Sequence, residues 1–574
     1  MMVSEETLDK SARKEKIRQE EIRDAGVPEF GVKNTSGIGL KPIYTPKDLE
    51  ERHDADILSL PGQFPYTRGS YPVHYQVYPP MIGQQMSLGD GEQTRERREF
   101  LQSIGRRLHI GMEEENFAMI IAVDAPTFSG FDADEPEARG KVGECAASMC
   151  IVDELEAAYD GAPSLANVPT LFVAFNSQPV LVAMYAVYAM DCRKEPLNDL
   201  VVWPVTQLHC QHYLDIASYP PRAGTKLNVE LIKWLRKNCP QSATYMVDGY
   251  NIGEAGAVPS FEVAAAFSEL MVTIDACVEA GMDPDDFLPG FYTHFHLGIN
   301  LFEEVAKFRA ARRLWAKLIK ERYGCRNPEA LKLKGYVDQC AGYDTVAQEP
   351  LNNLVRNTVM VMAGMFSDLD GIHPIAYDEP LGIPNNESLM LSTRTMQILV
   401  EETDVPHVTD PLGGSYYVEW LTSRMEEEIR KHLKGIDDRG GFIKCYESGW
   451  LRAEVARQAY ERMKAITSGE AVRVGSNKYR VEDKSPPMTI IRRPMELEDK
   501  IIAKVKRFKQ ERNSEKTKAS LLKLREICLE IENNWPASAG TLMPGIIEAV
   551  RADATLGECC RVFREVFGYG YWAK

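Results

Sequence analysis

Between residues 117 and 410, short apolar runs alternate with longer stretches in which apolar residues return every three or four positions. The short runs are typical of buried strands and the longer stretches of amphipathic helices. Strands are expected at 117–124, 169–176, 200–205, 244–249, 291–297, 333–339, 371–378 and 405–410. Eight strand–helix units over this length predict an α/β fold, a closed (β/α)8 TIM barrel. An open doubly wound sheet is the alternative, because periodicity alone does not prove closure.

The clearest helical patterns lie at 261–281, 302–324 and 351–366. Outside the barrel, residues 4–24 form a charge-laced helical pattern that leads into an extended arm rich in Gly and Pro. After about residue 420 the pattern becomes helical without strands, and the basic segment 500–531 predicts an outer connecting helix with solvated charges. We therefore expect three regions, listed here by residue number: an N-terminal helix and arm (1–60), the barrel (61–420) and a helical C-terminal region (421–574).

The composition narrows the range of partners. A formal net charge of −17 and a pI near 5.3 argue against nucleic acid or an anionic membrane as a general partner. The twelve cysteines are scattered without a CxxC pair, so neither a disulfide framework nor a zinc ribbon is indicated. The amino terminus lacks the apolar centre of a signal peptide, and no apolar run is long enough for a membrane span. The sequence predicts a reduced, cytoplasmic protein.

The segment TYMVDGYNIGEAG, residues 244–256, takes an apolar strand into a polar turn and then into a helix. It places Tyr250, Asn251 and Glu254 at the carboxyl end of a strand, where parallel α/β enzymes build their sites. Asn and Glu also suit the first turn of a helix, where they cap it and complement its dipole. Taken alone, the segment therefore leaves both interpretations open.

The fifth predicted strand contains an HxH motif. Tyr292, His294 and His296 share one face by the period of two, and Gly290 has the same parity. HxH also occurs in metal sites of barrel hydrolases, but those sites need further His and Asp ligands at other strand ends. No second HxH occurs, and the other close pair, His209 and His212, has helical spacing. We expect histidines that face the substrate or pack in the barrel, and no metal.

Eight sequence blocks point to a known family. They are, in order, TSGIGLKPIYTPKDL, FPYTRGSYP, DGYNIGEAGA, FEEVAKFRAARRLWAKL, LNNLVRNT, YDEPLGIP, DPLGGSYYVEWLT and LMPGIIEAV. In sequence and order they resemble the large subunit of adenosylcobalamin-dependent acyl-CoA mutases, the family of methylmalonyl-CoA, isobutyryl-CoA and 2-hydroxyisobutyryl-CoA mutases. The resemblance covers nearly the whole chain. It implies a barrel with the acyl-CoA along its axis and cobalamin across its carboxyl-terminal mouth, and a radical rearrangement of the carbon skeleton.

The resemblance also implies roles for individual residues. Glu254 and Glu379 fall on the two carboxylates that bind the adenosyl group, with Gly382 nearby. Tyr250 and Asn251 occupy the turn whose family His donates to the thioester carbonyl, and Gln85 falls on the position of the catalytic Tyr. The positions implied to bind substrate are Tyr71, His74, Leu214, Gly290, Tyr292, His294, His296 and Gln339.

Several of these positions depart from the family pattern. Leu214 stands where methylmalonyl-CoA mutases have the Arg that clamps the substrate carboxylate, and Gly290 and Gly83 also replace arginines. Tyr292 replaces a Ser, and Val337 replaces a His two residues before Gln339. Loss of fixed positive charge would leave a buried substrate carboxylate unpaired. With volume expected at the glycines and an aromatic lining, the sequence predicts a bulky or aryl-substituted acyl group rather than methylmalonyl-CoA.

The family carries cobalamin on a module with a DxHxxG sequence, which does not occur here. We therefore expect a separate small cobalamin-binding subunit, with a homodimer of heterodimers as the assembly. A non-catalytic scaffold on the same fold and a metal-dependent barrel hydrolase are the competing functions. The retained Glu254 and Glu379 favour the catalytic subunit over a drifted scaffold, and the hydrolase lacks ligands.

Overall fold

The computed structural model describes residues 32–50, 59–77, 80–105, 119–205, 217–335, 337–481, 491 and 493–571. Its strands are β1 (Val32–Lys33), β2 (Gly39–Leu40), β3 (Met81–Ile82), β4 (Met119–Ala122), β5 (Thr170–Val173), β6 (Val202–Val205), β7 (Tyr245–Asp248), β8 (Phe291–His294), β9 (His296–Leu297), β10 (Asp338–Cys340) and β11 (Gly371–His373). The predicted helix at 4–24 lies outside the described residues.

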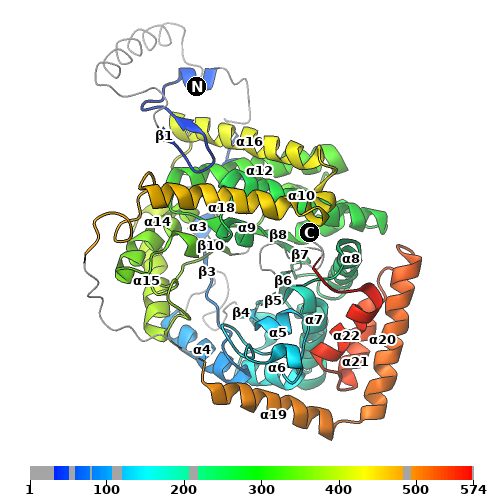
Figure 1. Ribbon diagram of the computed structural model, residues 1–574. Coiled ribbons are helices and arrows are strands. Elements are labelled where there is room, and N and C mark those ends of the chain that lie inside the picture. The colour runs from blue at the N-terminus through cyan, green and yellow to red at the C-terminus, as the bar shows by residue number, and fades with distance from the viewer. Residues whose placement is uncertain are drawn as a thin grey trace.

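The helices surround these strands (Figure 1). They are α2 (Lys47–Glu50), α3 (His74–Val77), α4 (Gly91–Ile104), α5 (Ala125–Phe128), α6 (Val152–Tyr159), α7 (Gln178–Val187), α8 (Pro221–Asn238), α9 (Tyr250–Glu254), α10 (Pro259–Glu279), α11 (Pro284–Phe287), α12 (Leu301–Tyr323), α13 (Pro328–Leu331), α14 (Asn353–Phe366), α15 (Asn386–Glu401), α16 (Tyr416–Asp437), α17 (Phe442–Glu447), α18 (Trp450–Ser468), α19 (Met495–Glu511), α20 (Ser514–Asn534), α21 (Leu542–Arg551) and α22 (Leu556–Phe567). Within the described residues, no helix combines the length and the apolar character needed to cross a bilayer.

Two parallel sheets form the centre of the protein. One has the order β4-β5-β6-β7-β8 and the other β3-β11-β10-β9. β8 and β9 are separated only by Phe295, and Gln85, just beyond β3, makes a parallel bridge with Ile120 of β4. The two sheets therefore join at both edges, and the eight strand positions of the described chain follow one another around a ring. This α/β architecture agrees with the predicted (β/α)8 barrel.

Most of the predicted strands are confirmed, but two assignments change. The apolar run at 333–339 contributes only its end, since the strand is Asp338–Cys340. The strand predicted at 405–410 is wrong, because this segment forms the short 3₁₀ helix Val405–His407 and a turn. The missing barrel strand is β3, at Met81–Ile82, which pairs with β11. Its apolar run is two residues long and follows prolines, so it carries little strand signal.

The outer helices form the layer that supports the sites at the strand ends. α10, α12 and α14 confirm the three clearest helical predictions. α16 packs on both α10 and α12, and the stack lies at the top of Figure 1. α10 is apolar on nearly every side because barrel strands cover one face and neighbouring helices the others.

Buried ion pairs join these helices. Arg309 of α12 contacts Asp410 at 2.5 Å and Glu419 at 2.6 Å, and Arg313 contacts Glu426 at 2.5 Å. Each pair joins α12 to α16 or to the loop before it. Charged residues of FEEVAKFRAARRL therefore lie inside the protein, where a cation needs polar partners. Arg312 finds them in the backbone carbonyls of Tyr66, Thr67 and Ser367.

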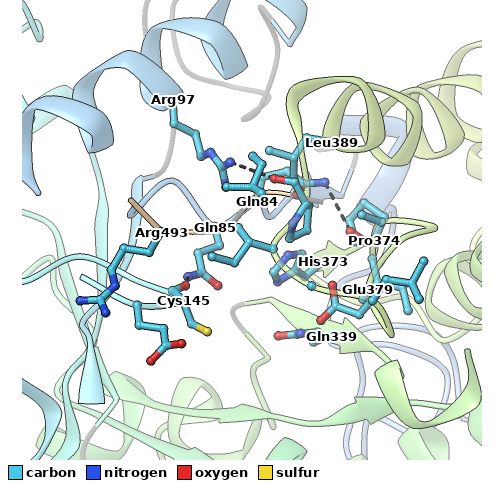
Figure 2. A pocket seen from close by; sticks show the side chains of 18 residues that line it. Gln84, Gln85, Arg97, Cys145, Gln339, His373, Pro374, Glu379, Leu389 and Arg493 are labelled. Carbon is cyan, nitrogen blue, oxygen red and sulfur yellow. Dashed lines mark hydrogen bonds between the residues drawn. The ribbon is translucent and has the colours of Figure 1, made fainter. Parts of the chain in front are cut away.

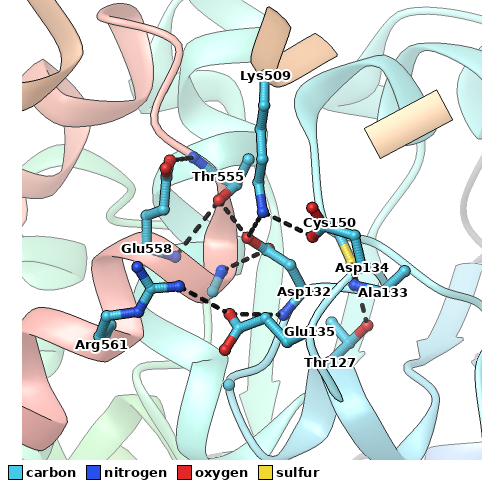
Figure 3. A network of polar contacts seen from close by, with 12 residues as sticks. Thr127, Asp132, Ala133, Asp134, Glu135, Cys150, Lys509, Thr555, Glu558 and Arg561 are labelled. Atoms are coloured by element: carbon cyan, nitrogen blue, oxygen red, sulfur yellow. Dashed lines mark hydrogen bonds and ion pairs between the residues drawn. The ribbon is translucent and has the colours of Figure 1, made fainter. Parts of the chain in front are cut away.

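The C-terminal helices attach directly to the barrel. The basic segment 500–531 forms two helices, since α19 ends before the helix-capping Asn513 of α20. Figure 3 shows the junction: Asp132 accepts hydrogen bonds from Thr555 and from the N–H of Gly557, and Lys509 lies 2.9 Å from its carboxylate. One buried carboxylate thus fastens α19 and α22 to a loop of the barrel.

Candidate active site

A cavity of about 690 Å³ opens at the carboxyl ends of β3, β10 and β11 (Figure 2). Its wall includes Gln85, Gln339, His373, Glu379 and Gly382, and Figure 2 shows several of these side chains converging on the open space. The amide of Gln85 donates to the Cys145 carbonyl at 3.2 Å. The cavity therefore gathers residues from separate strand ends, as expected for a site in a parallel barrel.

Two carboxylates lie close together at this end. Glu254 closes α9, and its Oε2 accepts the N–H of Tyr343 at 2.8 Å. A methyl group on Gly342 would lie 3.5 Å from both oxygens of Glu254 and 3.6 Å from Cγ of Glu379, so Gly342 leaves room beside both carboxylates. Burial raises the pKa of Glu254, and burial together with the charge of Glu254 raises the pKa of Glu379 to about 7.

The turn after β7 is organised by its own hydrogen bonds. Asn251 donates its backbone N–H and one side-chain N–H to Asp248, whose pKa is raised to about 7 by burial. The phenol of Tyr250 accepts a hydrogen bond from Gln339 at 3.0 Å. Tyr250 and Gln339 are thus brought together from β7 and β10, the strands on either side of β8 and β9. Contact of Asn251 with a thioester carbonyl stays a prediction. The second N–H of its amide would be the donor in that contact.

Three histidines line this half of the barrel. Nδ1 of His294 contacts the Val337 carbonyl, and its ring lies 5.2 Å from that of Tyr250. Burial lowers the pKa of His294 to about 4 and the pKa values of His296 and His373 to about 3. All three are therefore neutral at pH 7. His373 was not among the predicted site residues, although it stands inside the predicted strand 371–378 and alternates into the barrel as His294 does.

Other predicted substrate residues lie toward the amino ends of the strands. Nδ1 of His74 is 3.2 Å from Asp368, just before β11, and its ring lies 4.8 Å from that of Tyr71. Tyr292, in the first half of β8, has Lys334 at 5.9 Å from its ring. The predicted substrate residues thus divide between the two ends of the barrel. Only an extended ligand along the axis would contact both groups.

The glycines do not open the expected volume. A methyl group on Gly290 would lie 2.7 Å from Oγ1 of Thr244, and one on Gly83 would lie 2.4 Å from Cγ1 of Val337. Both distances are far below van der Waals contact, so neighbouring side chains already occupy the space that larger residues would fill. Leu214 lies outside the described residues. Among the described residues, no cluster of three or more His, Cys, Asp or Glu side chains is arranged to hold a metal ion.

Comparison with known proteins now decides the family. A family model described as methylmalonyl-CoA mutase matches residues 33–569. The chain belongs to this family. It is 31% identical to the 2-hydroxyisobutanoyl-CoA mutase large subunit of Aquincola tertiaricarbonis, over 92% of each chain. It is 28% identical to the methylmalonyl-CoA mutase of Escherichia coli (strain K12), over 95% of this chain and 73% of the relative. It is 27% identical to the mitochondrial methylmalonyl-CoA mutase of Homo sapiens, over 93% and 68%.

The match extends through both the barrel and the C-terminal helices, so family membership concerns the whole described fold. Proteins of this family are acyl-CoA mutases, which are isomerases of the intramolecular transferase class and use adenosylcobalamin.

Proposed function

We propose that this chain is the large, substrate-binding subunit of a coenzyme B12-dependent mutase that rearranges the carbon skeleton of an acyl-CoA by a radical mechanism. The observation that carries the proposal is the pair Glu254 and Glu379, two carboxylates that adjoin Gly342 at the carboxyl end of the barrel, with Glu379 in the wall of the cavity. No described Lys or Arg forms an ion pair with either of them. Structural carboxylates at such depth are normally paired, so this pair indicates a ligand that donates hydrogen bonds.

The deoxyadenosyl group of the cofactor fits these residues. Oε1 of Glu254 is buried without a hydrogen-bond partner among the described residues, and a ribose presents two hydroxyl donors. We assign Glu254 and Glu379 to those hydroxyls, with Gly382 in the adjoining wall. When bound, the cofactor supplies the radical that starts the rearrangement. The chain holds the group beside the substrate and keeps water away from it.

The proposed substrate is an acyl-CoA whose acyl group has no free carboxylate and is bulky or aryl-substituted. Neutral His373 and the amides of Gln85 and Gln339 form an uncharged part of the cavity wall, and Gln339 contacts the phenol of Tyr250. The two arginines of the same cavity already have partners, since Arg97 donates to the Pro384 carbonyl and Arg493 pairs with Glu498. A substrate carboxylate would have to displace one of these partners to gain a cation. The aromatic rings of Tyr250 and His294 support an aryl or branched group. The packing at Gly83 and Gly290 is tight, so these positions offer no extra volume and do not support a bulky acyl group.

We further propose that a separate small cobalamin-binding subunit with a DxHxxG motif completes the enzyme, as a homodimer of heterodimers. The relative from Aquincola tertiaricarbonis is named a large subunit, which supports a division between two chains. In this arrangement the partner brings cobalamin to the barrel mouth, where Glu254 and Glu379 receive the adenosyl group.

The experiment is reconstitution with such a small subunit, followed by measurement of the cob(II)alamin signal when an acyl-CoA is added. Glu254→Ala and Glu379→Ala should each weaken formation of the signal by about ten- to a hundredfold, the equivalent of about 1.5–3 kcal/mol for a charged hydrogen bond. An unaltered signal in both variants would contradict the assignment. In a panel of thioesters, faster turnover of methylmalonyl-CoA than of branched or aryl-substituted acyl-CoAs would contradict the proposed substrate.

A further inference from the structure

His296 and Glu254 present two unpaired polar atoms to each other at the carboxyl end of the barrel. Nε2 of His296 lies 3.9 Å from Oε1 of Glu254. Both atoms are buried, and neither has a hydrogen-bond partner within the described part of the chain. The His296 residue is only 4% exposed. A separation of 3.9 Å is too long for a direct hydrogen bond, so two groups that ordinarily require partners lack them at one place.

Contacts from three neighbouring helices hold His296 in this position. A methyl group on Gly253 would lie 2.6 Å from Cβ of His296, so only glycine lets the imidazole lie against α9 beside Glu254. The backbone N–H of His296 donates to Glu262 of α10 at 2.7 Å, and its carbonyl accepts from Lys307 of α12. Both main-chain polar atoms of His296 are therefore held by buried side chains of the outer helices, which fix the position of the ring.

The spacing suits one shared hydroxyl group. An oxygen at about 2.8 Å from both atoms forms a triangle with the 3.9 Å separation and an angle of about 90° at the oxygen. Such a hydroxyl donates its proton to Oε1 of Glu254 and accepts the proton on Nε2 of His296. The neutral imidazole carries one ring proton, so it can serve as this donor without a buried charge.

We infer that His296 is a further cofactor-binding residue, which donates from Nε2 to the same ribose hydroxyl of the deoxyadenosyl group that donates to Glu254. This inference rests on the proposed function and reassigns His296 from the substrate to the cofactor. Both unpaired atoms gain their partner from one ligand group. A direct ion pair is the poorer alternative, because it would require a buried imidazolium in a site that already contains Lys307.

The test titrates 5′-deoxyadenosine into the full chain by calorimetry, beside its analogues without the 2′- or the 3′-hydroxyl. His296→Ala should weaken binding of 5′-deoxyadenosine about five- to tenfold, the effect of one net hydrogen bond. It should leave unchanged the affinity for whichever analogue lacks the shared hydroxyl. That coupling between one residue and one hydroxyl identifies a contact, whereas a merely structural effect would weaken all three ligands alike.

Matched variants sharpen the result. His296→Gln places an amide N–H near the Nε2 position and should retain most of the affinity. His296→Asn reaches only the Nδ1 position and should behave like His296→Ala. His407→Ala, at an exposed position outside the cavity lining, should bind as the wild type does. This pair of amides keeps the test decisive if His296→Ala does not fold.

The outcomes separate this inference from the proposed function. Equal weakening of all three ligands by His296→Ala, or Gln and Asn variants of equal affinity, would overturn the role of His296. If Glu254→Gln weakens 5′-deoxyadenosine while His296→Ala does not, only this inference fails. Absence of binding to the wild-type chain, or no effect of Glu254→Gln, would overturn the proposed function and this inference with it.

Discussion

Two clusters of charged side chains in this protein differ in whether their carboxylates have a cation as partner. In the outer layer, Lys307 lies 2.6 Å from Glu304 and 3.1 Å from Glu262, so one cation serves two carboxylates. At the carboxyl end of the barrel, Glu254 and Glu379 adjoin one another, no Lys or Arg in the described ranges forms an ion pair with either, and burial raises the pKa of both. The difference shows that buried charge alone does not indicate a site. A carboxylate pair without a cation is a candidate site, because a ligand can supply the missing partner.

Removal of the cation from the outer cluster should give the largest effect. Lys307→Met leaves Glu262 and Glu304 buried without their cation, and the free energy of unfolding should fall by about 3–5 kcal/mol. Denaturant unfolding followed by circular dichroism measures the loss. Lys431→Met is the matched control, since Lys431 is 74% exposed and pairs with Glu428 on the surface, and its effect should stay below about 0.5 kcal/mol. A similar loss of unfolding free energy in the two variants would show that Lys307 does not stabilise its buried carboxylates more than a surface lysine does.

The contact of α9 with the barrel should give the next effect. Gly253→Ala places a methyl group 2.6 Å from Cβ of His296 and should lower the free energy of unfolding by about 1–3 kcal/mol through overpacking. Gly435→Ala is a suitable comparison, because a methyl group in that helical position meets only Arg439, at 3.7 Å. It should be neutral or stabilise by up to about 1 kcal/mol. Equal stability of the two variants would show that α9 yields to the extra volume.

The smallest effect concerns the pH dependence of stability. The pKa of Glu379 is about 7 in the folded protein against an ordinary 4.5, so its contribution is fully present below pH 4.5 and is lost as the pH rises through 7. Glu379→Gln removes the titration. The free energy of unfolding of Glu379→Gln, relative to that of the wild type, should therefore rise by about 1–2 kcal/mol between pH 5 and pH 8, with allowance for partial exposure.

Thermal or denaturant unfolding at both pH values tests this expectation. The matched variant Glu515→Gln, at a side chain 87% exposed, should differ from the wild type by the same amount at pH 5 and pH 8. If Glu379→Gln also shows a constant difference, the carboxylate pair is solvated in the free chain and the contrast with the Lys307 cluster fails.

The fold was predictable where periodicity is long and regular. The strands from β4 to β8 and the helices α10, α12 and α14 follow the pattern of apolar residues. The short strand β3 could not be predicted, because Met81 and Ile82 show no period and pair with β11 far along the chain. The false strand at 405–410 arose from three apolar residues whose segment instead turns so that Asp410 reaches Arg309.

The site was predictable at the level of motifs and less so at the level of contacts. The resemblance assigned Glu254 and Glu379 to one ligand, and in the structure the two carboxylates adjoin Gly342, with Glu379 in the cavity wall. The occupied space at Gly290 could not be foreseen, since Thr244 takes it from a neighbouring strand. The amide of Asn251 turned to Asp248 for a similar reason: local hydrogen bonds compete with ligand contacts, and sequence alone does not rank them.

The closure of the barrel has a consequence for its synthesis on the ribosome. The amide of Gln84, just after β3, bonds to the carbonyl of Pro374, 290 residues further along the chain. At a translation rate of about 5–20 residues per second, β3 emerges about 15–60 seconds before β11 can pair with it. During that interval the first strand of the barrel has an unpaired edge. The growing chain must therefore reach residue 374 before the cavity wall can exist, and a chaperone that shields nascent strands would act in that interval.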